Sequence, residues 1–451
     1  MSELGIFDQI PSLRAYTVVS LLWPIDNATQ DEIATALENA SLTLTKSFPF
    51  LAGQVINEKQ KGTENTSSGT FRIVDYEPHN GQPPIRVKDC TNLCPPYEEF
   101  RKAKTPISML DGNILSPMKG LPHYYDGSEP LPVFVLQANL INGGLILTSA
   151  CMHNALDMNG QGQVLRLLAQ ALRGEKFSEA QLRDGNVDRA KVIPLLKPEE
   201  KPLAHEWLRC PSSLSNPAFG GSPNPAPWKL FNFPGHKLVE LKAAAAKECG
   251  PGKDVPWIST NDALTAFLWQ RTLAARSARF GKDAESTLVR ASDARRSLDP
   301  PISERYMGHC VACTYSTGPA HKVVEEPIST IAAEIRKSRN GIDDYHIRSI
   351  ATLLNSLEDK TTFTYGAKFN PDTDLMVSSW AELRLYQSSF GPLLGKPEFI
   401  RRPLLTELES LVYLMPRTDD GGIAVAMSMR EDDAKVLMED EVWQYYTEMI
   451  G

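Results

Sequence analysis

The stretch LPVFVLQANLINGGLILTSACMHNALDMNGQGQVLRLLAQALRG, residues 131–174, carries the clearest local pattern in this sequence. It holds two apolar runs, 131–141 and 145–152, separated by an Asn-Gly-Gly turn signal, which predicts a β-hairpin. Apolar residues then recur at helical spacing from Val164 until Gly174, which is typical of an amphipathic helix and its end. A hairpin that leads directly into a helix indicates an α/β fold.

His153 and Asp157 form an H-x-x-x-D pattern between the predicted hairpin and helix, a common place for chemistry. A histidine near neutral pKa can take a proton from a hydroxyl or an amine, and Asp157 can fix local structure or the ring. With 8 histidines in the chain, chance alone gives about half a match. A buried histidine beside a capping aspartate therefore remains the alternative.

Helical and strand patterns alternate through the rest of the chain. Apolar spacing over 31–47 predicts a helix, and 236–248 and 259–280 predict two more, the last with Ser259 or Thr260 as its cap. Nine prolines fall between Pro194 and Pro234 and indicate an irregular connection between two domains. The last forty residues predict a hairpin around 419–422 and a helix from about Glu431.

The whole-chain composition is that of a globular protein of 451 residues, with 42% hydrophobic and 23% charged residues. The formal charge of −8 argues against a broad nucleic-acid surface, although a local basic patch can still bind one small anion. No apolar run reaches the roughly 20 residues of a membrane helix, and the N-terminus does not resemble a signal peptide. Seven scattered cysteines suit a reducing compartment, so we expect a cytoplasmic protein.

Several common enzyme motifs are missing from the sequence. There is no Gly-x-Ser-x-Gly, no phosphate loop and no dinucleotide fingerprint after a predicted strand. Cys310 and Cys313 form a C-x-x-C, but only His309 and His321 lie near it, and a zinc site needs a second ligand pair. Because the flanking sequence looks like a strand, we expect two buried small thiols there.

The H-x-x-x-D pattern is followed by four further motifs in a fixed order: LVRASDAR (288–295), YMGH (306–309), VSSW (377–380) and SFG (389–391). Together with FPFLAGQV (48–55) and STNDALTAFLW (259–269), this series resembles the BAHD-type acyl-CoA-dependent acyltransferases over nearly the whole chain. INGGLILT (141–148), LGKP (394–397) and RRP (401–403) are similar to the fungal trichothecene 3-O-acetyltransferase branch.

This resemblance implies two chloramphenicol-acetyltransferase-like α/β domains with an active-site channel between them. We expect an N-terminal domain at 1–190, a proline-rich crossover at 191–235, and a C-terminal domain at 236–451 that builds most of the CoA site. The implied activity is acetyl transfer from acetyl-CoA to a hydroxyl of a terpenoid, alkaloid or polyketide, with no metal. The implied enzyme is a monomer that binds neither nucleic acid nor membrane.

The resemblance also implies roles for particular residues. His153 would act as the general base, with both substrates bound together in a ternary complex. Asp157 would pair with Arg295, with Asp293 as further structural support. Ser378 and Trp380 would steady the substrate or the oxyanion, although strand packing is the alternative for Trp380. The residues that would contact CoA are Lys253, Arg290, Lys396 and Gly391.

Three positions depart from the family pattern. Ser389 replaces an aspartate that has a structural role in the family, Met158 follows Asp157 where glycine is common, and His309 stands where asparagine is usual. We therefore expect the acceptor pocket to differ from that of the trichothecene enzymes. Three other readings stay open: acyl transfer from a carrier protein, N-acylation of an amine, and a non-enzymatic binding module on the same fold.

Overall fold

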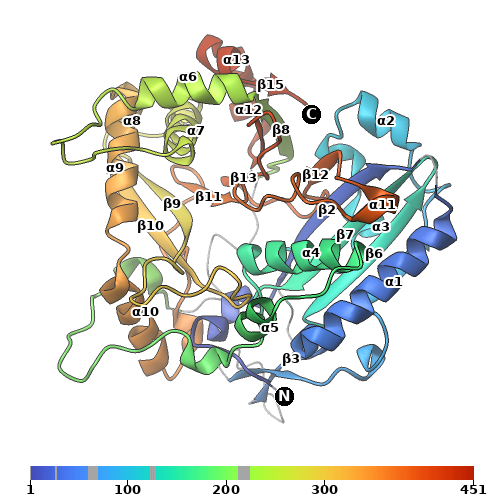
Figure 1. Ribbon diagram of the computed structural model, residues 1–451. Helices are drawn as coiled ribbons and strands as arrows, with labels where there is room; N and C mark the ends of the chain where they lie inside the picture. The colour runs from blue at the N-terminus through green and yellow to red at the C-terminus, as the bar shows by residue number, and fades with distance from the viewer. Residues whose placement is uncertain are drawn as a thin grey trace.

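The computed structural model describes residues 2–25, 28–58, 70–121, 123, 125, 128–211 and 224–451. The middle of the predicted crossover, 212–223, lies outside the described residues. Helices pack on two large mixed β-sheets, one on each side of the view in Figure 1, and a small third sheet lies near the N-terminus. The α/β prediction is confirmed.

The first large sheet has five strands and is built mainly from the N-terminal part of the chain. Its spatial order is β12 (Phe399–Arg401), β2 (Tyr16–Pro24), β7 (Gly144–Met152), β6 (Phe134–Ile141) and β5 (Ile85–Asp89). Two long helices, α1 (Gln30–Ser47) and α4 (Met158–Leu172), lie side by side on one face (Figure 1). The shorter helices of this half are α2 (Tyr97–Lys102), α3 (Gly112–Leu115), α5 (Glu179–Gly185) and α11 (Gly391–Leu394).

The second large sheet has seven strands. Its spatial order is β10 (Val311–Pro319), β9 (Glu285–Asp293), β11 (Leu375–Ser379), β13 (Leu411–Leu414), β14 (Ile423–Ser428), β8 (Trp228–Phe233) and β15 (Glu448–Met449). Its helices are α6 (Gly235–Ala245), α7 (Thr260–Arg276), α8 (Ala320–Glu325), α9 (Ile328–Asn340), α10 (Asp344–Ser356), α12 (Glu431–Glu439) and α13 (Glu441–Tyr446). The small sheet joins β1 (Ser2–Glu3), β4 (Phe71–Val74) and β3 (Gln54–Asn57).

Local chemistry explains why the predicted elements form. The hairpin between β6 and β7 turns at Gly143, whose φ of 71° favours glycine. A reciprocal capping box between Thr29 and Glu32 starts α1, and a second one between Ser259 and Asp262 starts α7. The predicted helices at 31–47, 236–248 and 259–280 are therefore confirmed with small shifts at their ends.

The two sheets do not divide the chain cleanly between its halves. Strand β12, from residues 399–401, pairs antiparallel with β2 of the first sheet. Trp380 and Phe390 also belong to the hydrophobic core that α4 and the first sheet form. The C-terminal part of the chain thus packs onto the helix that follows His153, while the domain limits at 190 and 235 stay a prediction.

Candidate active site

His153 lies in a tight turn that joins β7 to α4. Its backbone N–H donates to the Ala15 carbonyl at 2.8 Å, and the N–H groups of Ala155 and Leu156 turn back to the Met152 carbonyl. The Asn154 side chain donates to the carbonyls of Asp8 and Ile10, so the turn is also tied to the N-terminal segment. The imidazole therefore projects from a rigid support.

The hydrogen bonding of His153 fixes which ring nitrogen is basic. Nδ1 lies 3.2 Å from the Leu156 carbonyl oxygen, which can only accept, so Nδ1 carries the proton. In the neutral ring Nε2 then keeps its lone pair and is able to accept a proton. The ring is partly exposed, and burial lowers its pKa although the Leu156 carbonyl and Asp157 act in the opposite direction. Burial prevails, and the lowered pKa of His153 favours a neutral base at neutral pH.

The Asp157 carboxylate caps the N-terminus of α4 instead of binding the His153 imidazole. Its carboxylate accepts from the backbone N–H of Gly160 at 2.7 Å and from that of Cys310 at 2.9 Å. Arg295 donates to both carboxylate oxygens, at 2.9 and 3.0 Å. Burial alone would raise the pKa of Asp157, but the charge and hydrogen bonds of Arg295, together with the Gly160 N–H, leave this pKa below its usual value.

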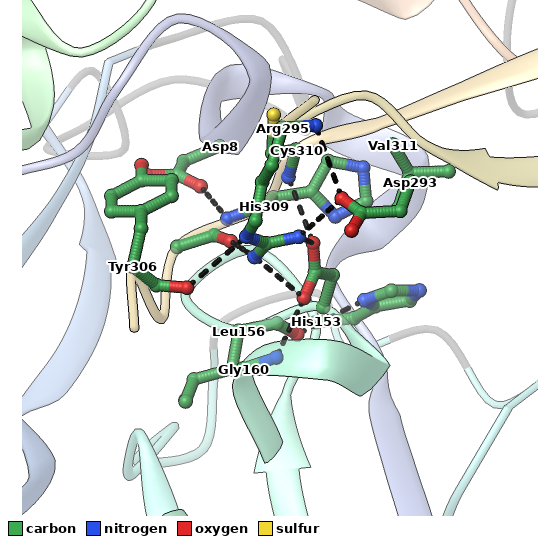
Figure 2. A network of polar contacts seen from close by, with 12 residues as sticks. Asp8, His153, Leu156, Gly160, Asp293, Arg295, Tyr306, His309, Cys310 and Val311 are labelled. Atoms are coloured by element: carbon green, nitrogen blue, oxygen red, sulfur yellow. Dashed lines mark hydrogen bonds and ion pairs between the residues drawn. The ribbon is translucent and has the colours of Figure 1, made fainter. Parts of the chain in front are cut away.

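Arg295 is the centre of this polar network (Figure 2). Besides Asp157 it donates to the Asp293 carboxylate at 2.8 Å and to the carbonyls of Tyr306 and Gly308 at 3.2 and 2.8 Å. Gly160 lets α4 approach this region, because a Cβ there would lie 2.0 Å from the Met307 carbonyl oxygen. The predicted pairing of Asp157 with Arg295 is present, and it joins the two halves of the molecule.

Asp8 is a second buried carboxylate in the network, and sequence reasoning missed it. It accepts the backbone N–H groups of Gly5 at 2.8 Å and His309 at 2.9 Å. Its nearest cation is Arg189, at 3.8 Å, whose guanidinium also donates to the Ala155 carbonyl. Burial raises the pKa of Asp8 to about 6, with only partial opposition from Arg189. Asp8 lies in a short 3-10 helix without a motif, so no sequence signal marks it.

His309 places a second imidazole beside the first. The rings of His153 and His309 meet edge to face with centroids 5.2 Å apart, and both are visible in Figure 2. Burial lowers the pKa of His309 to about 3, and the neighbouring His153 contributes to the shift. The His309 ring is therefore neutral throughout the physiological range.

Ser378 and Trp380 lie at the C-terminal end of β11. The indole N–H of Trp380 donates to the Ser378 hydroxyl oxygen at 3.2 Å, and the Trp380 ring packs against Tyr413. Trp380 is buried while Ser378 is partly exposed. Since the Ser378 oxygen accepts from the indole, its own O–H proton can be donated to another group. Trp380 thus orients the Ser378 hydroxyl through the hydrogen bond from its indole N–H.

The four residues predicted to contact CoA have different surroundings. Arg290 is buried and donates to Asp262 at 2.7 Å, so its charge is already compensated. Lys396 is exposed and pairs with Asp419 at 3.1 Å. Lys253 is exposed in a turn and forms no ion pair with any residue in the described ranges. Gly391 packs its backbone against the Leu172 carbonyl.

Gly391 is at the far end of α4 from His153, about 20 Å away for a helix of this length. This placement gives Gly391 a role in packing against the end of α4, and it does not support a contact with CoA. Nearby, the backbone carbonyl of Ser389, the position of the missing family aspartate, accepts from Arg173 at 2.6 Å. At this position Arg173 therefore contacts a main-chain oxygen.

Three further observations concern metal ligands, membrane helices and cysteines. Within those ranges, no group of three or more His, Cys, Asp or Glu side chains is arranged to hold a metal ion. No helix in the same ranges is long and apolar enough to cross a membrane. All seven cysteines are free thiols, and Cys310 and Cys313 are buried.

Comparison with known proteins places this geometry in a family. Residues 15–172 match the family model of the trichothecene 3-O-acetyltransferase-like N-terminal domain, and residues 115–442 match that of the Transferase family. The O-acetyltransferase dmxR13 of Cryptosporiopsis sp. is 39% identical over 100% of this chain and 98% of its own length.

Solved structures give the same result. The crystal structure of Fusarium sporotrichioides TRI101 complexed with coenzyme A and T-2 has a TM-score of 0.89 and 35% identity, covering 100% of this chain and 99% of that one. Vinorine synthase, at 16% identity, has a TM-score of 0.64 with coverage of 99% and 94%, and this likeness concerns the fold alone.

Proposed function

The chain belongs to the BAHD-like Transferase family and carries a trichothecene 3-O-acetyltransferase-like N-terminal domain, and on this premise we propose that it is an acetyl-CoA-dependent O-acetyltransferase of a fungal secondary metabolite. Its class, a CoA-dependent acyltransferase, follows from the family. The observation that carries the proposal is the His153 tautomer, with Nδ1 bound to the Leu156 carbonyl and Nε2 left as a base.

In the proposed mechanism, His153 Nε2 takes the proton of the acceptor hydroxyl as its oxygen attacks the thioester carbonyl. The imidazolium that forms is stabilised by the Leu156 carbonyl and by the nearby Asp157 charge. The Ser378 hydroxyl, polarised by the Trp380 indole, donates to the developing oxyanion. Collapse of the tetrahedral intermediate breaks the C–S bond, and His153 returns its proton to the departing CoA thiolate.

Asp157 and Arg295 do not take part in proton transfer in this proposal. Their mutual ion pair and their bonds to Gly160, Gly308 and Cys310 hold the His153 turn against the other half of the molecule. Since both substrates bind together, correct placement of the base replaces a covalent acyl-enzyme. Asp157 is therefore a positioning residue.

For the CoA phosphates, Lys253 is the most suitable of the predicted cations because it is exposed and has no ion-pair partner in the described part of the chain. Lys396 would first have to leave Asp419. The relatives that carry coenzyme A support this cosubstrate, and the free thiols support a cytoplasmic enzyme. A monomer is the expected form.

The test is acetyl-CoA turnover with a panel of alcohols, followed by release of the CoA thiol. His153→Ala should lower kcat by roughly 10²–10⁴-fold, the value of a positioned general base. Its unfolding free energy should change by less than about 1 kcal/mol, because the ring is partly exposed. Near-normal turnover in this variant would contradict the mechanism.

A matched control is available in the same chain. His205 and His346 form another edge-to-face pair, with centroids 5.1 Å apart, away from β7 and α4. His346→Ala should therefore keep full activity. Amines and an acetylated carrier protein, supplied in place of the alcohols and acetyl-CoA, test the two other transferase readings, and we expect no product from either.

A further inference from the structure

His309 occupies a position beside the base that the proposed reaction does not use. It is 1% exposed, and its ring meets the His153 ring edge to face at 5.2 Å between centroids. It comes from the segment before β10, whereas His153 follows β7. Figure 2 shows the two imidazoles next to each other at the junction of the two halves.

The backbone around His309 is clamped on both sides. Its N–H donates to Asp8 at 2.9 Å, the next N–H, of Cys310, donates to Asp157 at 2.9 Å, and the preceding carbonyl, of Gly308, accepts from Arg295 at 2.8 Å. Three buried charged side chains therefore fix this short turn. The backbone that carries the His309 ring is therefore fixed by hydrogen bonds to side chains from other segments of the chain.

The tautomer of His309 follows from Tyr365. The Tyr365 hydroxyl donates its only proton to the Val311 carbonyl at 2.7 Å, so its oxygen can only accept from His309 Nε2, which lies 3.4 Å away. Nε2 therefore carries the proton, and Nδ1 keeps a lone pair. This buried Nδ1 has no hydrogen-bond partner among the residues that the structure describes.

A buried acceptor without a donor is unfavourable and needs a reason. The two ring nitrogens point in divergent directions, so Nδ1 faces away from Tyr365. We propose that His309 is a specificity-determining residue whose Nδ1 accepts a hydrogen bond from a second hydroxyl of the acceptor, close to the hydroxyl that His153 deprotonates. This inference rests on the proposed function, since it concerns the acceptor in that reaction.

The chemistry of the two substrates favours the acceptor as the source of this donor. An acetyl group and a thioester carbonyl carry no N–H or O–H, so neither can donate to Nδ1. On the CoA side, the donors closest to the thioester are the amide N–H groups of the pantetheine arm. A change in the KM for acetyl-CoA in a His309 variant would identify that alternative, whereas a change in the acceptor KM supports the proposal.

The experiment compares 2,3-dihydroxynaphthalene with 2-naphthol, two probes that differ only in the second hydroxyl. The wild-type enzyme should prefer the diol by roughly 10-fold in kcat/KM, the value of one additional hydrogen bond. His309→Phe keeps a ring but lacks Nδ1, and it should abolish the preference through the acceptor KM. His309→Asn restores a side-chain acceptor and should recover part of it.

Tyr315→Phe is the matched control, because it removes a hydroxyl that donates to the Tyr365 carbonyl at 2.8 Å and that does not contact His309. It should keep the wild-type preference. The proposal is overturned if the wild type does not prefer the diol, if His309→Phe retains the preference, or if only the acetyl-CoA KM changes.

Nitrogen NMR of labelled histidine gives a second measurement that does not need turnover. The His309 Nδ1 resonance should report an unprotonated nitrogen and should shift with 2,3-dihydroxynaphthalene but not with 2-naphthol. An unchanged resonance with both probes overturns the proposal. If no alcohol is acetylated at all, the proposed function fails, and the resonance still decides the role of His309.

Discussion

Asp157 and Asp8 perform the same structural task under different electrostatic conditions. Both carboxylates are fully buried, and they accept the backbone N–H groups of neighbouring residues, Cys310 and His309. Asp157 also receives two bonds from Arg295 at about 3 Å, whereas Asp8 lies 3.8 Å from Arg189. The pKa of Asp157 is accordingly lowered, and that of Asp8 is raised to about 6.

The comparison shows that burial alone does not decide the cost of a charge. A forked arginine pair compensates for the lost hydration of Asp157, and because its pKa is lowered this carboxylate is charged at neutral pH. Arg189 divides its guanidinium between Asp8 and the Ala155 carbonyl, so compensation of Asp8 is incomplete. The turn that carries His309 is thus held by one permanent charge and one that titrates.

The largest expected effect comes from removing the charge of the permanent clamp. Asp157→Asn leaves Arg295 buried with a weaker set of partners, and breaking such a pair typically costs about 3–5 kcal/mol. We expect that loss in the free energy of unfolding at pH 7.5, measured by urea denaturation with circular dichroism. Activity should fall together with stability, because the same carboxylate holds the His153 turn.

Asp293→Asn is the matched control, since Asp293 binds the same guanidinium at 2.8 Å but its side chain is 38% exposed. An exposed partner contributes about 1 kcal/mol or less. Equal losses in the two variants would show that burial of the Asp157 pair is not what makes it important, and would remove the basis of the comparison.

Asp8 makes the stability of the fold depend on pH. Its pKa rises from 3.8 to about 6 on folding, so the folded state holds this proton more tightly and stability falls as pH rises between these values. About two pKa units correspond to roughly 3 kcal/mol. Asp8→Asn stays neutral, so the wild type should lose about that much relative to the variant between pH 4 and 7.5.

The same pH window separates the two carboxylates. Because the pKa of Asp157 is lowered, its contribution is complete above pH 4 and declines only at lower pH. Urea denaturation of the wild type and Asp8→Asn at several pH values measures the difference. Parallel curves for the two proteins would mean that Asp8 is not held in an under-compensated charged state.

The sequence could identify one clamp and not the other. The residue pattern around His153 and Asp157 predicted the end of the hairpin and the start of the helix, and the resemblance to the acyltransferase family implied the pair of Asp157 with Arg295. The partner of Asp8 is a backbone N–H 301 positions away, in a contact that no periodicity encodes. For Arg290 the sequence motif was misleading. It suggested a cation available for CoA, but Asp262, 28 positions earlier, pairs with this arginine.

The elements of the fold were likewise predictable where their signals are local in sequence. Elements with strong local signals, such as the β6–β7 hairpin and the capped helices α1 and α7, were predictable because turn and cap chemistry is local. Strand β12 is only three residues long and pairs with β2 far away in sequence. Such a strand forms because β2 leaves an edge of the sheet unpaired, and three residues carry too little local signal to predict a strand.

The smallest expected effect is the coupling between the two carboxylates themselves. The charge of Asp157 contributes to the raised pKa of Asp8, so the two repel each other weakly. Each single Asn variant relieves this repulsion, whereas the double variant relieves it only once. At pH 7.5 the double variant should therefore be less stable than the summed effects of the two single variants predict, by on the order of 0.5 kcal/mol, the lower end for coupled sites.

The same double-mutant cycle at pH 4.5, where Asp8 is protonated, should show additivity. Coupling that persists at pH 4.5 would have to come from a shared change in the 308–310 backbone, and the two clamps would then be one mechanical unit rather than two charges.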